Sequence, residues 1–553
     1  MKLIINRISP GVKSVRSALA ICACLCMFQI RVIAAMSTWI APSTSGNWNT
    51  SSNWSGGAVP GAADSIILSG SSGKSPWTMS AITLEVSDIA YNLSGNDRRL
   101  RNDSTATDSI LVLNGTSTTL LMNLMTGRNF SINALGGGAV PHLLTVQLKT
   151  SGTFNSSGTA GDATLGGSGL VINAPITESG GSRSLALTGP GAITLSGTNS
   201  YTGGTIVAMT GGTVWMSGSG TAGVFNGTLG APGSPLSIQS GTLDLGSSSQ
   251  RVGVVTITGG LVQSGTLTGD SFLATGSGTS TINSVIAGSG DLTKSGSGKL
   301  VLGGSNTYTG KTNVTDGTLV VSGNISGSLC QLSGGTLRGS GTAGVLVVQS
   351  AGTISPGIES GPGILSVASL ELQAGSHLVI RLGGTVAGAG YDQLAVSGEI
   401  SLAGDLQGSL INGFNPASAT VNPETLHINL DGDKFFIASG SGITGNFSNE
   451  GPANVNLPGF GTVMIGGREF AISYSGNAVA NSFTGGTDVV LMAIPETNIL
   501  GMMLCGLAVI TGIGGSRRFG RLGRYPAKVH NRTGGSHLCR SDVVNTGRDY
   551  PCG

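Results

Sequence analysis

Charged and aromatic residues are scarce in this chain of 553 residues. Only 10% of its residues are charged and 5% are aromatic, whereas an average globular domain is about 25% charged. This composition is unlike that of an ordinary soluble enzyme. Cysteine is nearly absent from the middle of the chain, because Cys330 alone lies between residues 36 and 495, and the other six lie toward the two ends. A disulfide framework is therefore excluded for the middle of the chain.

Basic charge is also missing from the body of the chain. The formal net charge is +2, but residues 1–35 carry five basic residues and no acid, and residues 517–553 carry eight basic residues and two acids. Between these ends, with Glu496 set aside, 15 basic residues stand against 23 acidic ones, a net charge of −8. Nucleic-acid binding needs a basic face for phosphate contacts. Only the short run 98–101 is basic here, so we expect no nucleic-acid partner.

Glycine and short apolar runs are what the chain has in abundance. It contains 94 glycines and 39% apolar residues, and its mean hydropathy is +0.24. Disordered chains lack this much surface to bury. Many short strands between small-residue turns are the natural interpretation, and the length suits either a few domains or one extended repeat array.

The N-terminus has the pattern of a secretory signal. Basic residues up to Arg16 precede an apolar run over 18–30, and Ala34 and Ala35 are small residues suited to cleavage. We therefore predict export of the chain. Arg31 departs from the usual pattern, so an uncleaved anchor is the alternative.

A second apolar run, over 499–513, lies near the C-terminus. It follows Pro495-Glu496-Thr497 and precedes an arginine cluster that begins at residue 517. As a helix it would reach about 22 Å, against roughly 30 Å for a hydrocarbon core. The flanking arginines favour a short membrane segment with a cytoplasmic C-terminal side. A buried core helix is the alternative.

This arrangement resembles the PEP-CTERM sorting signal of Gram-negative bacteria, with Thr497 in place of a usual second proline. The resemblance implies that an exosortase-like membrane protease is a partner. It also implies a sorting motif made of Pro495, Glu496, Thr497, Arg517 and Arg518. The tail over 525–553 has no apolar periodicity, and we predict that it is disordered.

Internal repeats decide the predicted fold. The segment Leu195-Ser-Gly-Thr-Asn-Ser-Tyr-Thr-Gly-Gly-Thr-Ile-Val207 returns 107 residues later as Leu302-Gly-Gly-Ser-Asn-Thr-Tyr-Thr-Gly-Lys-Thr-Asn-Val314. Each copy runs into a Gly-Thr-apolar element, and the same element recurs elsewhere. Its glycines are Gly212, Gly227, Gly241, Gly265, Gly317 and Gly335.

The Gly-Thr-apolar element is suited to one rung of a solenoid. Glycine permits the positive φ of a tight turn, threonine suits the start of a strand, and the apolar side chain points inward. Stacking the rungs at about 4.8 Å builds one narrow core. We expect Asn199 and Asn306 to bond backbone groups in turns, and Tyr201 and Tyr308 to pack at corners. An array of β-sandwiches is the alternative fold.

These repeats resemble the autotransporter-associated β-strand repeat, and the resemblance extends over roughly residues 37–490. Trp48-Asn-Thr-Ser-Ser-Asn-Trp54 looks like the first segment of such proteins. Ser355-Pro-Gly357, Tyr391-Asp-Gln-Leu394 and Gly445-Asn-Phe447 look like their closing section. The resemblance implies a passenger-like segment that folds as a right-handed parallel β-helix outside the cell.

An enzyme of the β-helix type, acting on polysaccharides, is the rival hypothesis, and it would need clustered carboxylates. Asp244, Asp270, Asp291 and Asp316 are spaced 21 to 26 residues apart, each near a turn. We interpret Asp431-Gly432-Asp433 as a hairpin turn, since a calcium loop needs further ligands. The five histidines fit no metal motif. We therefore predict no catalytic residues, no cofactor and no metal.

The predicted fold class is all-β: a right-handed parallel β-helix with a β-rich closing section and one short C-terminal hydrophobic helix. The predicted function is that of an exported structural or adhesive protein of the cell surface or matrix, with polysaccharide or neighbouring surface proteins as partners. The alternative is a polysaccharide lyase or hydrolase. The predicted parts are a signal peptide (1–35), an N-terminal β segment (36–90), β-solenoid repeats (91–370), a C-terminal β-rich section (371–490), the sorting segment (494–524) and the tail (525–553).

Overall fold

The structure is a computed structural model that describes residues 36–40, 46–69, 77–79, 82–93, 98–102, 104, 107–115, 118–124, 129–133, 143–157, 169–216 and 228–495. Within these residues the fold is all-β, with one 3-10 helix, η1 (Ser51–Asn53), and no α-helix. None of the described helical structure is long and apolar enough to cross a membrane. The predicted signal peptide and C-terminal hydrophobic helix lie outside the described residues.

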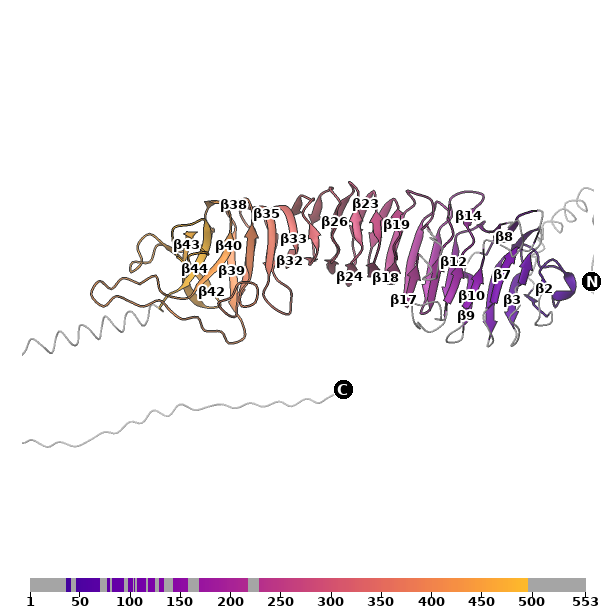
Figure 1. Cartoon of the computed structure of the whole chain (residues 1–553), viewed down its shortest axis with the longest axis horizontal. Helices are drawn as coiled ribbons and strands as arrows, with labels where there is room; N and C mark the ends of the chain where they lie inside the picture. Colours follow the sequence, from indigo (N-terminus) through magenta and orange to yellow (C-terminus); the bar gives the residue numbers. More distant parts are fainter. Residues whose placement is uncertain are drawn as a thin grey trace, which may run out of the picture. The chain divides into compact units, whose positions relative to one another are not determined.

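The strands follow one another from residue 36 to residue 493 (Figure 1). The first are β1 (Met36–Thr38), β2 (Gly46–Asn47), β3 (Ser65–Ser69), β4 (Trp77–Met79), β5 (Thr83–Val86), β6 (Asp88–Leu93), β7 (Arg98–Asn102), β8 (Ser109–Leu113), β9 (Thr118–Leu124), β10 (Asn129–Ile132), β11 (Leu144–Leu148), β12 (Gly152–Ser156), β13 (Gly169–Ile172), β14 (Ile176–Glu178), β15 (Leu185–Gly189) and β16 (Ala192–Leu195). The middle strands are β17 (Thr205–Trp215), β18 (Leu236–Asp244), β19 (Ser249–Arg251), β20 (Val254–Ile257), β21 (Gly260–Gln263), β22 (Thr266–Thr268), β23 (Ser271–Ala274), β24 (Thr279–Ile282), β25 (Val285–Ala287), β26 (Asp291–Lys294), β27 (Lys299–Leu302), β28 (Thr312–Val314), β29 (Thr318–Val321), β30 (Asn324–Ile325), β31 (Cys330–Leu332) and β32 (Thr336–Gly339). The last are β33 (Thr342–Val348), β34 (Thr353–Pro356), β35 (Ile364–Leu372), β36 (His377–Leu382), β37 (Gln393–Val396), β38 (Glu399–Leu402), β39 (Asp405–Leu410), β40 (Lys434–Ser439), β41 (Gly442–Gly445), β42 (Gly461–Ile465), β43 (Arg468–Gly476) and β44 (Asp488–Ala493).

The strands pair in parallel with their counterparts one turn of the chain earlier and later. In one column Lys299 pairs with Thr318, Thr318 with Thr336, and Thr336 with Thr353. Parallel pairing of this kind runs from β1 to β41. It therefore passes through residues 90 and 370 without a break, and it differs from the antiparallel pairing of a β-sandwich. The stacked arrangement is consistent with a parallel β-helix.

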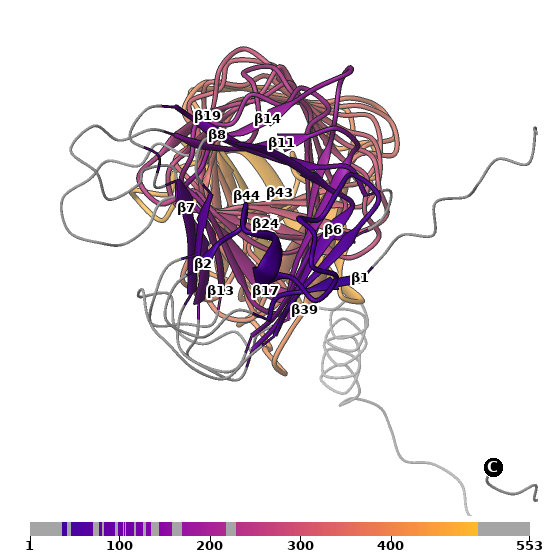
Figure 2. The same cartoon turned by 90° about the vertical axis from the view of Figure 1, so that its right-hand side faces the viewer.

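Alternation along each strand places every second side chain in the interior. Leu300, Leu319, Leu337, Ile354 and Leu378 occupy one inward column, each directly paired with the next, and all five are fully buried. Viewed along the stack, the strands surround a common interior (Figure 2). Stacked columns of this kind build one continuous main core, because no single rung could bury its own apolar face.

Two shorter sheets complete parts of the stack. One has the order β14-β11-β8-β5 and the other β19-β22-β25. They belong to separate stretches of the chain, residues 83–178 and 249–287, whereas the main sheet of 37 strands continues through both.

Tryptophan side chains fill the N-terminal end of the stack. Trp39, Trp48, Trp54 and Trp77 are each at least 94% buried, and the Trp54 indole N–H donates to the Trp48 carbonyl oxygen at 3.0 Å. Ser55 covers the edge of β1, because its amide donates to Thr38 O and its hydroxyl accepts from Thr38 N. An exposed strand edge invites pairing with another chain, so this loop acts as a cap.

An antiparallel sheet closes the other end. β44 lies between β40 and β43, and β42 pairs with β43. One face of this sheet joins the main core through Phe435, Phe470 and Leu491. The opposite face packs with the loops of residues 419–483 in a second core; its members are Ala419, Ile428, Phe436, Leu457, Ala471, Phe483, Val490, Met492 and Ile494.

Cys330 offers a test of the packing inside the stack. Its thiol is fully buried on β31, and burial raises its pKa to about 12. We expect no reaction with a thiol reagent at pH 8 in the folded protein, and full reaction of this thiol after unfolding in guanidinium, because only the thiolate reacts. Peptide mapping of the labelled sites would measure this. Rapid native labelling of Cys330 would contradict the closed packing.

Candidate functional site

The asparagines of the repeat motif form hydrogen bonds inside the fold. The Asn199 side-chain oxygen accepts a hydrogen bond from the Ile176 amide at 2.9 Å, and Asn306 accepts from Ile286 in the same way at 2.9 Å. Ile176 and Ile286 belong to β14 and β25, which are the last strands of the two short sheets. Each asparagine thus supplies the acceptor that a following strand would have supplied, and the turn role predicted for it is confirmed.

The two motif tyrosines are equally internal. The Tyr201 hydroxyl lies 2.6 Å from Thr205 Oγ1, and the Tyr308 hydroxyl lies 2.6 Å from Thr312 Oγ1. Both rings are at least 99% buried. Burial raises the pKa of Tyr201, and it raises the pKa of Tyr308 to about 12. The predicted packing role is confirmed.

The scattered aspartates stay apart, each with local partners. Asp244 accepts from the Gln263 amide at 2.6 Å, Asp270 lies 3.5 Å from Arg251, Asp291 accepts from Lys311 N, and Asp316 accepts from Gly317 N. Asp431 accepts from Thr420 N and Asp433 from Ala417 N. The hydrogen bonds from Thr420 lower the pKa of Asp431. These carboxylates therefore link neighbouring segments or stabilise local turns.

His377, Asp405 and Ser448 gather in the closing section. The Asp405 carboxylate lies 3.6 Å from His377 Nδ1 and accepts a hydrogen bond from the Ser448 hydroxyl. A catalytic serine must instead bond the histidine, with the aspartate behind it. The carboxylate stands between the other two groups, so this trio is not arranged as a nucleophilic triad. Among the described residues no group of three or more His, Cys, Asp and Glu side chains is placed to hold a metal.

A shallow groove crosses the outer face of β33, β35, β38 and β41. Its lining includes Val345, Ser369, Glu371, Glu399, Ser401 and Thr444. Glu371 pairs directly with Ser401, and Glu399 lies two residues before Ser401 on β38. Strand spacing and rise per residue place the two glutamate positions about 8 Å apart. The groove thus combines two exposed carboxylates with hydroxyl groups.

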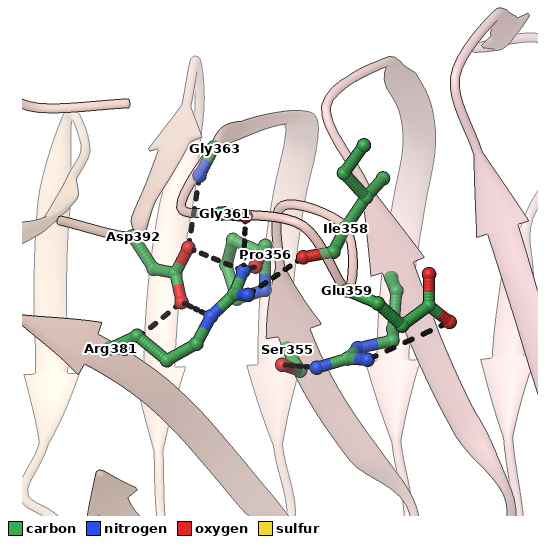
Figure 3. Close-up of polar contacts among 9 residues, drawn as sticks. Ser355, Pro356, Ile358, Glu359, Gly361, Gly363, Arg381 and Asp392 are labelled. Atoms are coloured by element: carbon green, nitrogen blue, oxygen red, sulfur yellow. Dashed lines mark hydrogen bonds and ion pairs between the residues drawn. The ribbon is translucent and has the colours of Figure 1, made fainter. Parts of the chain in front are cut away.

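Arg381 on β36 organises a loop at the side of the stack (Figure 3). Its guanidinium donates to Pro356 O, Ile358 O and Gly361 O at 2.7 to 2.9 Å. It also forms an ion pair with Asp392 at 2.8 Å. We call residues 356–363 the strap.

Asp392 is the buried partner of this arrangement. Its carboxylate is fully buried and accepts from Gly363 N, Arg381 N and the Arg381 guanidinium. Burial raises its pKa, and the contacts with Arg381 oppose that effect. A buried charge needs such complete pairing. The segments Ser355-Pro-Gly357 and Tyr391-Asp-Gln-Leu394, singled out in the sequence, therefore meet through an arginine that no motif had indicated.

The predicted processing residues lie mostly outside the described part. Pro495 is the last described residue. It is half-buried and directly follows the buried Ile494 of the second core. The other members of the two predicted sites, Ala34, Ala35, Glu496, Thr497, Arg517 and Arg518, lie outside the described residues. The described fold thus ends where the predicted sorting motif begins.

Two segments, residues 185–215 and 292–321, match the family model described as Passenger-associated-transport-repeat. They contain both copies of the motif found in the sequence. These two segments of the chain are thus similar to passenger-associated repeats. The chain is 33% identical over 171 residues to an "Extracellular serine protease" of Serratia marcescens, and 33% identical over 181 residues to the "Adhesin BmaC autotransporter" of Brucella suis. These matches cover 30% and 32% of this chain, but only 15% and 5% of the two relatives.

Proposed function

We propose that this chain is an exported surface or matrix protein with a structural and adhesive role. The names of the two relatives, an extracellular protease and an adhesin, favour export. The solenoid would be the part presented outside the cell. We propose a right-handed coil, because crossovers between parallel strands are right-handed in nearly all sheets.

The observation that carries the proposal is an uncharged column along the outer face, which we call the neutral column. It consists of Thr256, Leu273, Thr293, Asn313, Gln331 and Val347, each paired directly with the next. All six are half-buried, and along each strand they alternate with the buried inward side chains. At one rung per 4.8 Å the column extends about 24 Å. A linear polymer lying along it could make many weak contacts at once.

Charge placed in the neutral column should weaken binding. We expect Gln331→Glu to lower retention of the protein on a neutral polysaccharide, because it places a carboxylate within the column. Thr281→Glu is the matched control, since it adds the same charge on the outer face of β24, outside this column. Pull-down on dextran or cellulose measures the effect. Equal retention of both variants and the unchanged protein would contradict the role of the column.

We further propose that the chain is sorted through its C-terminal segment and processed by an exosortase-like protease. The position of Pro495 directly after Ile494 of the second core supports this, because the last described strand is complete before the predicted motif begins. Mass spectrometry of the mature protein is expected to find an N-terminus near Ala35 or Met36 and a C-terminus near Pro495. An unprocessed C-terminus in a surface fraction would sink the sorting proposal.

A polysaccharide-cleaving enzyme is the second candidate. Glu371 and Glu399 of the outer groove support it, because their α-carbons lie about 8 Å apart on one face by strand geometry, and inverting glycosidases use two carboxylates to activate a water and protonate the leaving group. This candidate expects release of reducing ends from a matrix polymer, and loss of that release in Glu371→Gln and in Glu399→Gln. The adhesive proposal expects binding without release.

A further inference from the structure

Three charged side chains lie close together on the outer face beside the strap. Lys299 Nζ lies 3.5 Å from a carboxylate oxygen of Glu359, and Arg338 Nη1 lies 3.9 Å from the same oxygen. Lys299 starts β27, Arg338 lies on β32, and Glu359 belongs to the strap. Lys299 and Arg338, 39 positions apart in the sequence, thus share one carboxylate.

The two cations line a row of hydroxyl groups. Lys299 lies in a column that continues through Thr318, Thr336 and Thr353, and Arg338 follows Thr336 by two residues on the same face of β32. All of these side chains are half-buried. A carboxylate bound between Lys299 and Arg338 would therefore have hydroxyl donors and acceptors beside it.

The strap presents Glu359 to these cations in a fixed place. Gly357 exchanges two backbone hydrogen bonds with Gly339, at 2.8 and 2.9 Å, which lays the strap against β32. Gly357 has φ of +77°, and a Cβ there would lie 2.5 Å from Arg381 Nη2, so only glycine fits. Arg381 holds the carbonyl oxygens on either side of Glu359, those of Ile358 and Gly361 (Figure 3).

The ion pairs with Glu359 are weak and incomplete. Its side chain is 58% exposed, and both separations exceed a normal hydrogen bond. Exposed pairs of this kind contribute little to stability. Arg338 donates to Ser355 Oγ at 3.2 Å, but its Nε is buried without a hydrogen-bond partner among the described residues. A guanidinium can donate two parallel hydrogen bonds to a carboxylate, and here that capacity is not used.

The charge of the surroundings makes the two cations distinctive. Between residues 252 and 380 the other basic residues are Lys294 and Lys311. Lys294 is 98% buried and donates to backbone oxygens of Gly296 and Asp316. The body as a whole has a net charge of −8. An anionic polymer would be repelled by most of this surface and attracted to the Lys299 and Arg338 position.

We propose that Lys299 and Arg338, with the hydroxyl column beside them, bind carboxylate groups of an acidic polysaccharide, and that Glu359 of the strap occupies this position until the polymer displaces it. The inference rests on the proposed surface function and adds a ligand class to it. The strap then acts as an internal competitor. Because the competing ion pairs are weak, displacement requires little binding energy from the polymer.

The test measures binding of the full-length protein to polygalacturonate, with dextran as the neutral polymer. Glu359→Gln keeps the size of the side chain and removes its charge. We expect this variant to bind polygalacturonate about three- to fivefold more tightly than the unchanged protein, which corresponds to loss of one exposed ion pair. The double variant Lys299→Gln, Arg338→Gln is expected to lose binding of polygalacturonate and to keep any binding of dextran.

Lys311→Gln is the matched control, because it removes one exposed positive charge just before β28. Native protection of the Cys330 thiol verifies that each variant is folded. Equal affinity of Glu359→Gln and the unchanged protein, or an equal loss in Lys311→Gln, would overturn the proposal. The two proposals fail in different ways. If the neutral column has no binding role, the protein does not bind dextran, but Glu359→Gln still tightens the binding of polygalacturonate.

Discussion

Replacing Tyr308 by alanine is expected to lower the free energy of unfolding by about 3–5 kcal/mol, the usual cost of removing a large buried ring. The ring is 99% buried at a corner of the stack, so its removal leaves a cavity in a close-packed interior. The variant also leaves Thr312 without its tyrosine partner. Urea unfolding followed by circular dichroism measures the change.

Tyr308→Phe is the matched control, since it keeps the ring and removes only the hydroxyl. We expect a cost of about 1 kcal/mol at pH 8, because Thr312 Oγ1 still lies 2.8 Å from Ser328 Oγ. An equal loss in the two variants would mean that the hydroxyl, and not the ring, carries the effect.

The stability of the unchanged protein and that of Tyr308→Phe should depend differently on pH. Burial raises the pKa of Tyr308 from 10 to about 12, so the unfolded chain releases this proton first. The stability linked to Tyr308 is complete below pH 10 and is lost as the pH rises through 12. The unchanged protein should therefore lose stability faster than Tyr308→Phe between pH 10 and 12. Parallel pH profiles of the two proteins would contradict this assignment.

Removing β44 should convert the protein into an aggregating species. Truncation after Thr487 deletes Asp488–Ala493, the strand that joins β40 to β43. It also removes Val490 and Met492 from the second core and Leu491 from the main core. The edge of β40 would become free, and a free edge over an open core recruits other chains.

Truncation after Pro495 is the matched control, because it keeps β44 and Ile494. Size-exclusion chromatography and thioflavin T binding compare the two proteins. We expect the longer protein to remain monomeric or in its native assembly, and the shorter one to elute in the void volume. A soluble shorter protein with an unchanged melting temperature would contradict the role of the antiparallel sheet as a cap.

The sequence by itself was sufficient for the all-β class and for stacked rungs. Both follow from local chemistry, since a Gly-Thr-apolar element specifies a turn, a strand start and an inward side chain within a few residues. The recurrence of the element then requires stacking, because a single rung has no second layer to cover it. The same local reasoning correctly predicted internal roles for Asn199, Asn306, Tyr201 and Tyr308.

The tertiary structure alone decided which distant groups meet. Arg381 lies on β36 and Asp392 directly before β37, and both contact a loop that begins at residue 356. Glu359 reaches Lys299 only because the rungs between them are stacked at a fixed spacing. The antiparallel closure by β44 likewise depends on β43 and β40, whose paired residues lie 12 to 58 positions earlier in the chain. Such contacts depend on register and on the path of the chain, which short-range patterns do not encode, whereas the rung itself is specified by its own few residues.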